Sequence, residues 1–88
     1  MKDIHTTILE NANNINTFED FVRIAGASGM EEIKESINYY TDEEVYKDYN
    51  ENTYIIEYLK DSCFYCINEM HTKSLIIYST LLNKLWNY

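Results

Sequence analysis

The sequence predicts an all-α fold, a small bundle of about five short helices that forms one acidic domain over residues 1–88. The first observation is that the chain has no proline and only two glycines, Gly26 and Gly29. An all-β domain needs turn residues between many short strands, and this chain lacks them. The second is that apolar residues recur at steps of three and four through most segments. The third is the length, because 88 residues make one domain with a thin stability margin.

The first two helices are predicted in the N-terminal third. Four apolar residues lie on one helical face there: Ile4, Ile8, Ala12 and Ile15. Three asparagines, which are weak helix formers, end that helix: Asn11, Asn13 and Asn14. Either Asn16 or Thr17 can cap the second helix, since Glu19 follows Asn16 by three residues. Gly26 ends it as a left-handed C-cap.

Two more helices are predicted after Gly26. Ser28 and Glu31 have the spacing of a capping box, and an amphipathic stripe follows them: Met30, Ile33, Ile37 and Tyr40. Thr41 and Glu44 repeat the capping-box spacing. Tyr40 and Val45 flank this second box at the spacing of a hydrophobic staple, so a short helix is expected to begin there and end near Asn50 to Asn52.

Residues 53–67 allow two interpretations. One helical stripe fits the apolar residues Ile55, Leu59, Cys63, Cys66 and Met70, with Ile56 and Ile67 beside it. The same segment is rich in tyrosine, isoleucine and phenylalanine, so a hairpin that turns at Lys60–Asp61 would give an α+β fold instead. That pair is a poor two-residue turn, because such turns favour glycine at the second position. A helix is therefore the favoured prediction and the hairpin the alternative.

The C-terminal segment is apolar nearly all round a helix. An unbroken helix from Thr53 to Asn87 would be about 50 Å long, so we expect a break near His71 to Lys73. A helix of this kind is either central to the core or shared with a second chain. The residues predicted to support self-association, and with it a homodimer, are Leu75, Tyr78, Leu82, Leu85 and Trp86.

The charge is concentrated in the middle of the chain. The whole sequence carries a net charge of −8, and residues 31–61 hold ten acidic residues against three lysines, a net of −7. Six of the nine tyrosines lie in the same segment. Direct binding to nucleic acid or to an anionic membrane is disfavoured, because phosphate contacts require lysine and arginine. The expected partner is a protein with a basic surface, such as a nucleic-acid-processing enzyme.

The predicted partner-binding residues combine carboxylates for steering and arginine pairing with tyrosines as anchors. They are Glu43, Glu44, Tyr46, Asp48, Tyr49, Glu51, Glu57 and Asp61. Carboxylates four residues apart on one helix are separated by about 6 Å along its axis, whereas phosphates of one DNA strand recur about every 3.4 Å. Imitation of DNA would therefore require two acidic helices side by side. A solvated acidic surface without a binding role is the alternative interpretation.

Cys63 and Cys66 form a CxxC motif with three interpretations. Both fall on the predicted buried stripe, so we favour two small core residues. Together with His5 and His71 they would supply four zinc ligands, but a second motif with ligand spacing is absent. A redox motif would open a helix after a strand, which is not expected here. No metal and no cofactor are therefore predicted, and the serines show no catalytic-triad signature.

As a short acidic chain rich in tyrosine and asparagine, the sequence resembles the small inhibitors and antidefence proteins that phages and mobile elements encode. The resemblance is one of composition. It implies a non-enzymatic inhibitor, such as an anti-CRISPR protein or DNA mimic, that docks its acidic surface on a basic site. The alternative is a self-associating structural or regulatory helical module. A cytoplasmic location is expected, because residues 1–9 lack the apolar stretch of a signal peptide and no apolar run reaches about 20 residues.

Overall fold

Helices account for all the regular structure in the part of the chain that the computed structural model describes, residues 2–40 and 49–86. The elements are α1 (Ile4–Asn11), the short 3₁₀ helix η1 (Ala12–Asn14), α2 (Phe18–Tyr40), α4 (Glu51–Asn68) and α5 (Thr72–Trp86). The all-α prediction is confirmed, with four α-helices in these residues rather than about five. The two helices expected on either side of Gly26 are the two parts of α2, which a non-helical kink at Gly26 separates, and the capping box Thr41–Glu44 with its staple residue Val45 lies outside the described residues.

Side-chain caps explain where the first two helices begin. The Asp3 carboxylate accepts a hydrogen bond of 2.8 Å from the backbone N–H of Thr6 at the start of α1. Of the two candidate caps for α2, Thr17 has the role: its hydroxyl accepts from the N–H of Asp20 at 3.1 Å. The Asp20 carboxylate in turn accepts from the N–H groups of Asn16 and Thr17 at 2.9 and 3.2 Å. This is a reciprocal capping box in which aspartate replaces the usual glutamate.

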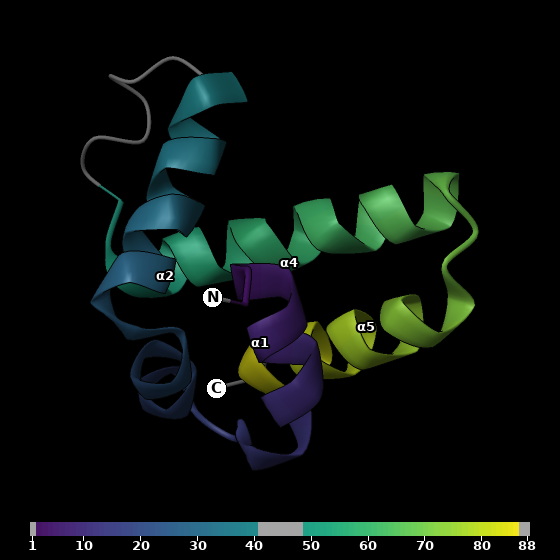
Figure 1. Ribbon diagram of the computed structural model, residues 1–88, viewed down its shortest axis with the longest axis horizontal. Coiled ribbons are helices and arrows are strands. Elements are labelled where there is room, and N and C mark those ends of the chain that lie inside the picture. Colours follow the sequence, from purple (N-terminus) through teal and green to yellow (C-terminus); the bar gives the residue numbers. More distant parts are fainter. Residues whose placement is uncertain (1, 41–48, 87–88) are drawn as a thin grey trace.

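Gly26 ends the first helical part of α2, as predicted, and a second part follows it. Its backbone has φ 73° and ψ 172°, so the positive φ that the sequence predicts is present, but the ψ is extended rather than left-handed helical. The helix resumes directly afterwards, and Ser28 lies within it. Figure 1 shows the result as two nearly straight parts of α2 that point in different directions. The second part approaches α1, where Gly29 lies next to Ile4, and it carries Glu31, Glu32 and Glu35.

Residues 53–67 are helical, and the hairpin alternative is wrong. Helix α4 begins after Asn50, whose side-chain oxygen accepts from the N–H of Thr53 at 2.9 Å. The helix ends in a Schellman motif: the N–H of His71 donates to the carbonyl of Cys66 at 2.9 Å and the N–H of Met70 to that of Ile67 at 3.3 Å. Met70 occupies the left-handed position of this motif with φ 59°. The break expected near residues 71–73 is therefore confirmed, and α5 starts at Thr72.

The helices enclose one hydrophobic core. Helices α4 and α5 run antiparallel as a hairpin, α1 lies across them, and α2 contacts both α1 and α4 (Figure 1). The fully buried large side chains come from all four helices and the linker after η1: Ile8, Ile15, Phe21, Ile33, Ile55, Leu59, Leu81 and Leu85. Lys84 ties the end of α5 to that linker, because its ammonium donates to the Ile15 carbonyl at 2.8 Å. The radius of gyration, 12.4 Å, is close to the roughly 12 Å expected of a folded domain this long.

The distribution of apolar residues along a helix decides whether that helix could cross a membrane. Each helix carries polar residues on its outer side, as the exposure pattern of α2 and α4 demonstrates. Within residues 2–40 and 49–86, no helix combines the length and the apolar character needed to cross a bilayer.

Candidate functional site

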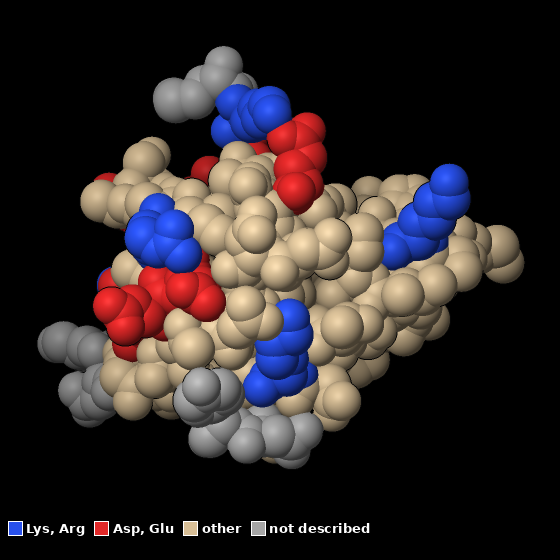
Figure 2. Space-filling view, turned by 90° about the horizontal axis from the view of Figure 1, so that it is seen from below, with Lys and Arg blue, Asp and Glu red and all other residues tan. Residues whose placement is uncertain are grey.

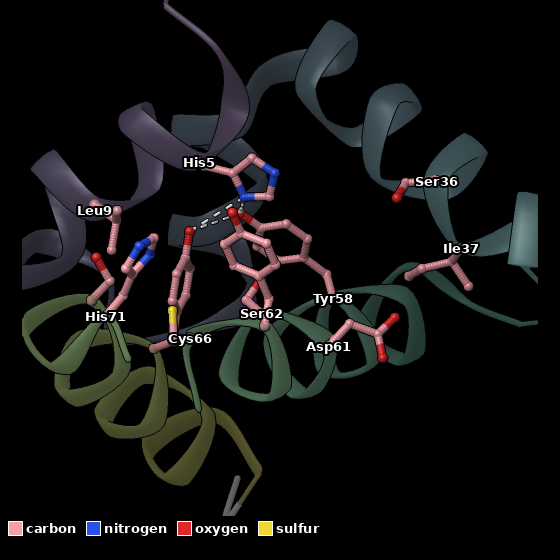
Figure 3. Close-up of a pocket in the computed structure, with 12 residues that line it drawn as sticks. His5, Leu9, Ser36, Ile37, Tyr58, Asp61, Ser62, Cys66 and His71 are labelled. Carbon is pink, nitrogen blue, oxygen red and sulfur yellow. Dashed lines mark hydrogen bonds between the residues drawn. The ribbon is translucent and has the colours of Figure 1, made fainter. Parts of the chain in front are cut away.

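A pocket of about 540 Å³ lies where the helices of the bundle meet. Its lining comes from α1 (His5, Leu9), α2 (Ser36, Ile37), α4 (Tyr58, Asp61, Ser62, Tyr65, Cys66), the loop after α4 (His71) and α5 (Ser74, Tyr78). Figure 3 shows these side chains around the space between α1, α2 and α4, with Asp61 reaching toward Ile37 of α2. The volume is within the range of small-molecule and side-chain binding pockets.

Three polar side chains from three helices meet at one wall of the pocket. The Tyr58 hydroxyl lies 2.9 Å from Nδ1 of His5, and the Tyr78 hydroxyl lies 3.3 Å from the same nitrogen. The two hydroxyl oxygens are 3.4 Å apart. Dashed lines mark these contacts in Figure 3. The network satisfies the buried phenols and connects α1 to both helices of the α4–α5 hairpin.

The surroundings raise the pKa of the two buried tyrosines and of Asp61. Burial raises the pKa of Tyr58 far above its ordinary value, and the hydrogen bond with Tyr78 adds to the effect. Burial also raises the pKa of Tyr78, so both phenols remain neutral at physiological pH. Partial burial, followed by the charge of Glu57, raises the pKa of Asp61, while Lys60 opposes the shift. The pocket therefore holds neutral hydroxyls and a carboxylate whose charge is incompletely compensated.

The two cysteines have the surroundings of core residues. Cys66 is buried and lines the pocket, Cys63 is half-buried, and both are free thiols. Burial raises the pKa of each thiol, and the neighbouring Cys66 raises that of Cys63 further. A redox-active cysteine requires a lowered pKa, so the shift opposes that interpretation. Within the described part of the chain, no three histidine, cysteine or acidic side chains converge as metal ligands.

The predicted partner-binding residues are dispersed over the first half of α4. Glu51 is exposed in its first turn and Glu57 is half-buried, while Tyr49 packs edge-on against Tyr54 with centroids 6.0 Å apart. Asp61 is exposed and also lines the pocket. The other predicted residues, Glu43, Glu44, Tyr46 and Asp48, lie outside the described residues.

The structure adds acids on α2 to this surface. Glu31, Glu32 and Glu35 are all exposed on its second part. Helix α2 is joined to the start of α4, because the Tyr54 hydroxyl donates to the Asn38 side chain at 3.1 Å and Lys34 lies 4.0 Å from the Glu51 carboxylate. Two acid-bearing helices are therefore in contact. The face seen from below in Figure 1 is mostly uncharged, with separate groups of basic and of acidic residues on it (Figure 2).

The residues predicted to support self-association divide into two groups. Tyr78 and Leu85 are 3% and 1% exposed, so the core of this chain already covers them. Leu75 and Leu82 are half-buried against the same core. Trp86 alone among the five is largely exposed, at 57%, and the Lys60 ammonium lies 5.4 Å from its ring centroid.

A set of exposed apolar residues near the α4–α5 loop was not anticipated. It consists of Phe64, Tyr65, Ile67, Met70 and Ile76. The prediction that Met70 continues the buried stripe is wrong: it is 87% exposed, because the helix ends at Asn68 and the positive φ of Met70 turns the chain away. The exposed positions Phe64 and Ile67 could have been found by plotting α4 as a helix, since they fall outside the stripe of Leu59 and Cys66.

The pocket itself was not predicted. The sequence groups His5 only with the candidate zinc ligands, whereas its hydrogen-bond partners are 53 and 73 residues further along the chain. No spacing rule joins residues that far apart, so only the fold brings them together. Chemically, the pocket offers hydrogen-bond acceptors, aromatic rings and one carboxylate, while the surface of α2 and α4 offers several carboxylates.

Comparison with protein-family models, with curated proteins and with solved structures gives no match for this chain.

Proposed function

We propose that the chain is a non-enzymatic inhibitor that docks its acidic, tyrosine-rich surface on the basic, nucleic-acid-binding site of a target enzyme. Phage-encoded antidefence proteins, anti-CRISPR proteins among them, act in this general manner, and the cytoplasm is where such a target is met. The contact between two acid-bearing helices, α2 and α4, is the observation that carries the proposal. It supplies the second row of carboxylates that imitation of a nucleic acid requires.

The surface carboxylates are poorly neutralised by the chain's own lysines. Within the described residues, Lys34 is near Glu51 and Lys60 pairs with Glu57 at 3.4 Å. The exposed Glu31, Glu32 and Glu35 make no ion pair there. Like charges at this spacing repel, so a basic partner would relieve the repulsion as well as form new pairs. A strongly negative surface also accelerates association with a positive one at low ionic strength.

The test starts with capture of partners from cells of the source organism or its host, followed by stepwise elution with salt. The captured enzyme is then purified, and its nucleic-acid binding is measured with and without the chain. The proposal predicts competition with nucleic acid and an affinity that falls as salt rises. An enzyme that binds the chain and its nucleic acid simultaneously would contradict it.

A pair of triple variants locates the surface. The first variant changes Glu31, Glu32 and Glu35 to glutamine. It should weaken binding to the enzyme by about tenfold or more, since each charged contact contributes to the rate of encounter and to pairing with basic residues. The matched control changes three exposed acids elsewhere, Glu10, Glu19 and Glu69, and removes the same total charge. Equal loss with both triples would mean that only net charge matters, and no loss with the first would exclude this surface.

Self-association is the second candidate function, and the exposed apolar residues favour it. Phe64, Ile67 and Ile76 are each more than half exposed around the α4–α5 hairpin. Large apolar side chains exposed in this way are frequent at protein interfaces. Sedimentation at micromolar concentration tests the idea, with Phe64→Glu and Ile67→Glu as disrupting changes. A monomer at all concentrations would exclude a dimer, whereas a dimer lost in both variants would move the interface from α5 to this end of α4.

A further inference from the structure

We propose that the pocket bounded by Asp61 receives the guanidinium group of an arginine side chain presented by the basic partner. The inference rests on the proposed function, because it names the kind of residue that the target enzyme inserts. It differs from that function in location: the binding group is in a pocket of about 540 Å³ between α1, α2 and α4, and not on the outer acidic surface.

The charge of the pocket determines which ligand fits. Asp61 is the only carboxylate among the residues that line it, and neither lysine nor arginine lines it. A bound anion would therefore have no lysine or arginine partner, whereas a cation would have Asp61. Asp61 is exposed as well as part of the pocket lining, so an entering cation can reach its carboxylate.

The nearest lysine on α4 does not provide that cation. The Lys60 ammonium lies 3.4 Å from the Glu57 carboxylate and 5.4 Å from the centre of the Trp86 ring. Its charge acts on Asp61 through space, but Asp61 makes no ion pair with any described residue. Asp61 thus faces a cavity with its charge available for a ligand.

The remaining walls suit a planar cation with several donors. The hydroxyls of Ser36, Ser62 and Tyr58 line the space as hydrogen-bond acceptors, and Figure 3 shows Ser36 entering it from α2 opposite Asp61 on α4. A guanidinium has five N–H donors in a fixed plane and can donate two of them to one carboxylate. A lysine ammonium is a compact, strongly hydrated charge and would use fewer of these groups.

Aromatic rings complete the site. Tyr65 lies at the pocket with His71 packed edge-on against it, ring centroids 5.7 Å apart, and Tyr58 and Tyr78 form the inner wall. Cations are attracted to aromatic faces, most strongly where water is excluded. The chain already uses this contact twice within itself, with Lys34 over Tyr54 at 5.9 Å and Lys60 over Trp86. The pocket presents the same chemistry with no lysine or arginine among the residues that line it.

A titration with short peptides tests the site without knowledge of the partner. The probe is acetyl-Gly-Arg-Gly-amide, and the controls replace arginine with lysine or with citrulline, its uncharged isostere. Binding is followed by backbone amide NMR and by calorimetry. We expect arginine to bind several-fold more tightly than lysine, citrulline not to bind, and the largest shifts at Ser62 and Cys66. Equal binding of arginine and citrulline, or shifts confined to Glu31–Glu35, would overturn the inference.

Two variants on the same helix separate a pocket effect from a charge effect. Asp61→Asn removes the pocket carboxylate, and Glu57→Gln removes one charge four residues away that does not line the pocket. Asp61→Asn should weaken the arginine peptide by about tenfold or more, and Glu57→Gln by less than about threefold, because a direct charge-assisted pair is stronger than a screened one. Equal effects of the two variants would refute the pocket.

The same variants distinguish this inference from the proposed function. They also distinguish a partner's arginine from a free guanidinium compound as the ligand of the pocket. If the enzyme still binds tightly to Asp61→Asn but not to the Glu31, Glu32 and Glu35 triple variant, the inhibitor function stands and the arginine pocket falls. If the peptide requires Asp61 but the enzyme does not, the pocket takes free guanidinium compounds rather than a partner's arginine, which also refutes the proposal. Loss of both peptide and enzyme in Asp61→Asn supports it.

Discussion

The hydroxyl of Tyr58 on α4 lies 2.9 Å from Nδ1 of His5 on α1, and the two rings are stacked with their centroids 5.5 Å apart. The pair joins the first helix of the chain to a helix that begins more than 40 residues later. Tyr58 is buried and His5 is exposed, so the hydrogen bond satisfies a phenol that water cannot reach well. Its removal should be measurable in the stability of the whole domain.

Tyr58→Phe is predicted to lower the free energy of unfolding by about 1–2 kcal/mol, because it removes the shorter hydrogen bond to His5 and leaves the Tyr78 hydroxyl with His5 alone. Urea denaturation followed by circular dichroism measures the change. Tyr65→Phe is the control, since Tyr65 is largely exposed and makes no such hydrogen bond among the described residues. Similar stabilities of the two variants would show that the network contributes little.

Alkaline pH is predicted to destabilise the fold through the buried phenols. Burial raises the pKa of Tyr58 and Tyr78 above the ordinary value of 10.0. Above that pH the unfolded chain releases these protons while the folded chain retains them, so the unfolded state binds fewer protons and stability falls as pH rises. Below pH 10 the contribution is fully present. Unfolding free energies measured from pH 8 to 11 should decline, and the Tyr58→Phe, Tyr78→Phe double variant should decline less steeply.

Asp61→Asn is predicted to raise the free energy of unfolding at pH 7 by a few tenths of a kcal/mol, a gain that solvent screening keeps small. Because partial burial and Glu57 raise its pKa in the folded state, the folded chain binds more protons than the unfolded chain between the two pKa values. Stability is therefore lost as pH rises through that window, and asparagine avoids the loss. The gain should vanish below about pH 4, and Glu32→Gln on exposed α2 surface is the control.

Met70→Gly is predicted to stabilise the domain by about 1 kcal/mol. Met70 holds the left-handed position of the motif that ends α4, with φ 59°, where glycine has no side chain to clash with the backbone. Its side chain is almost fully exposed, so little packing is lost. Met70→Ala keeps the Cβ atom and should give no such gain. Thermal denaturation of the two variants measures the difference.

Gly26→Ala is predicted to destabilise the domain by about 1–3 kcal/mol, because a φ of 73° with a ψ of 172° is a region that only glycine adopts readily. The space around a new Cβ is open, so the cost is in the backbone and not in a clash. Ser28→Ala, inside the helix two residues later, should be neutral or slightly stabilising. A neutral Gly26→Ala would mean that the kink straightens without loss.

The features predicted successfully from sequence are those set by near neighbours. Helix caps depend on three or four consecutive residues, so the start of α2 at Thr17 and the break before Thr72 followed from local patterns. The stripe of Met30, Ile33 and Ile37 is buried as its spacing predicts. These rules need no knowledge of what a helix packs against.

The features that the sequence did not predict depend on contacts between residues far apart in the chain. The apolar character of α5 suggested an interface with a second chain, yet Tyr78 and Leu85 are used within this chain. Periodicity identifies an apolar face but does not identify the surface that covers it. The pocket escaped for the same reason, because His5, Tyr58 and Asp61 share no local pattern and are assembled only by the packing of four helices.

The meeting of His5 with Tyr78 also has a consequence for the order of folding. Their contact spans 73 residues, nearly the length of the chain, whereas α4 and α5 are joined by a loop of a few residues. Closing a short loop loses less chain entropy than closing a long one, so the α4–α5 hairpin is expected to form early and α1 to dock late. Interactions that form after the transition state govern how fast a protein unfolds. The hydrogen-bond network of His5, Tyr58 and Tyr78 is therefore expected to slow unfolding, and to change the folding rate much less.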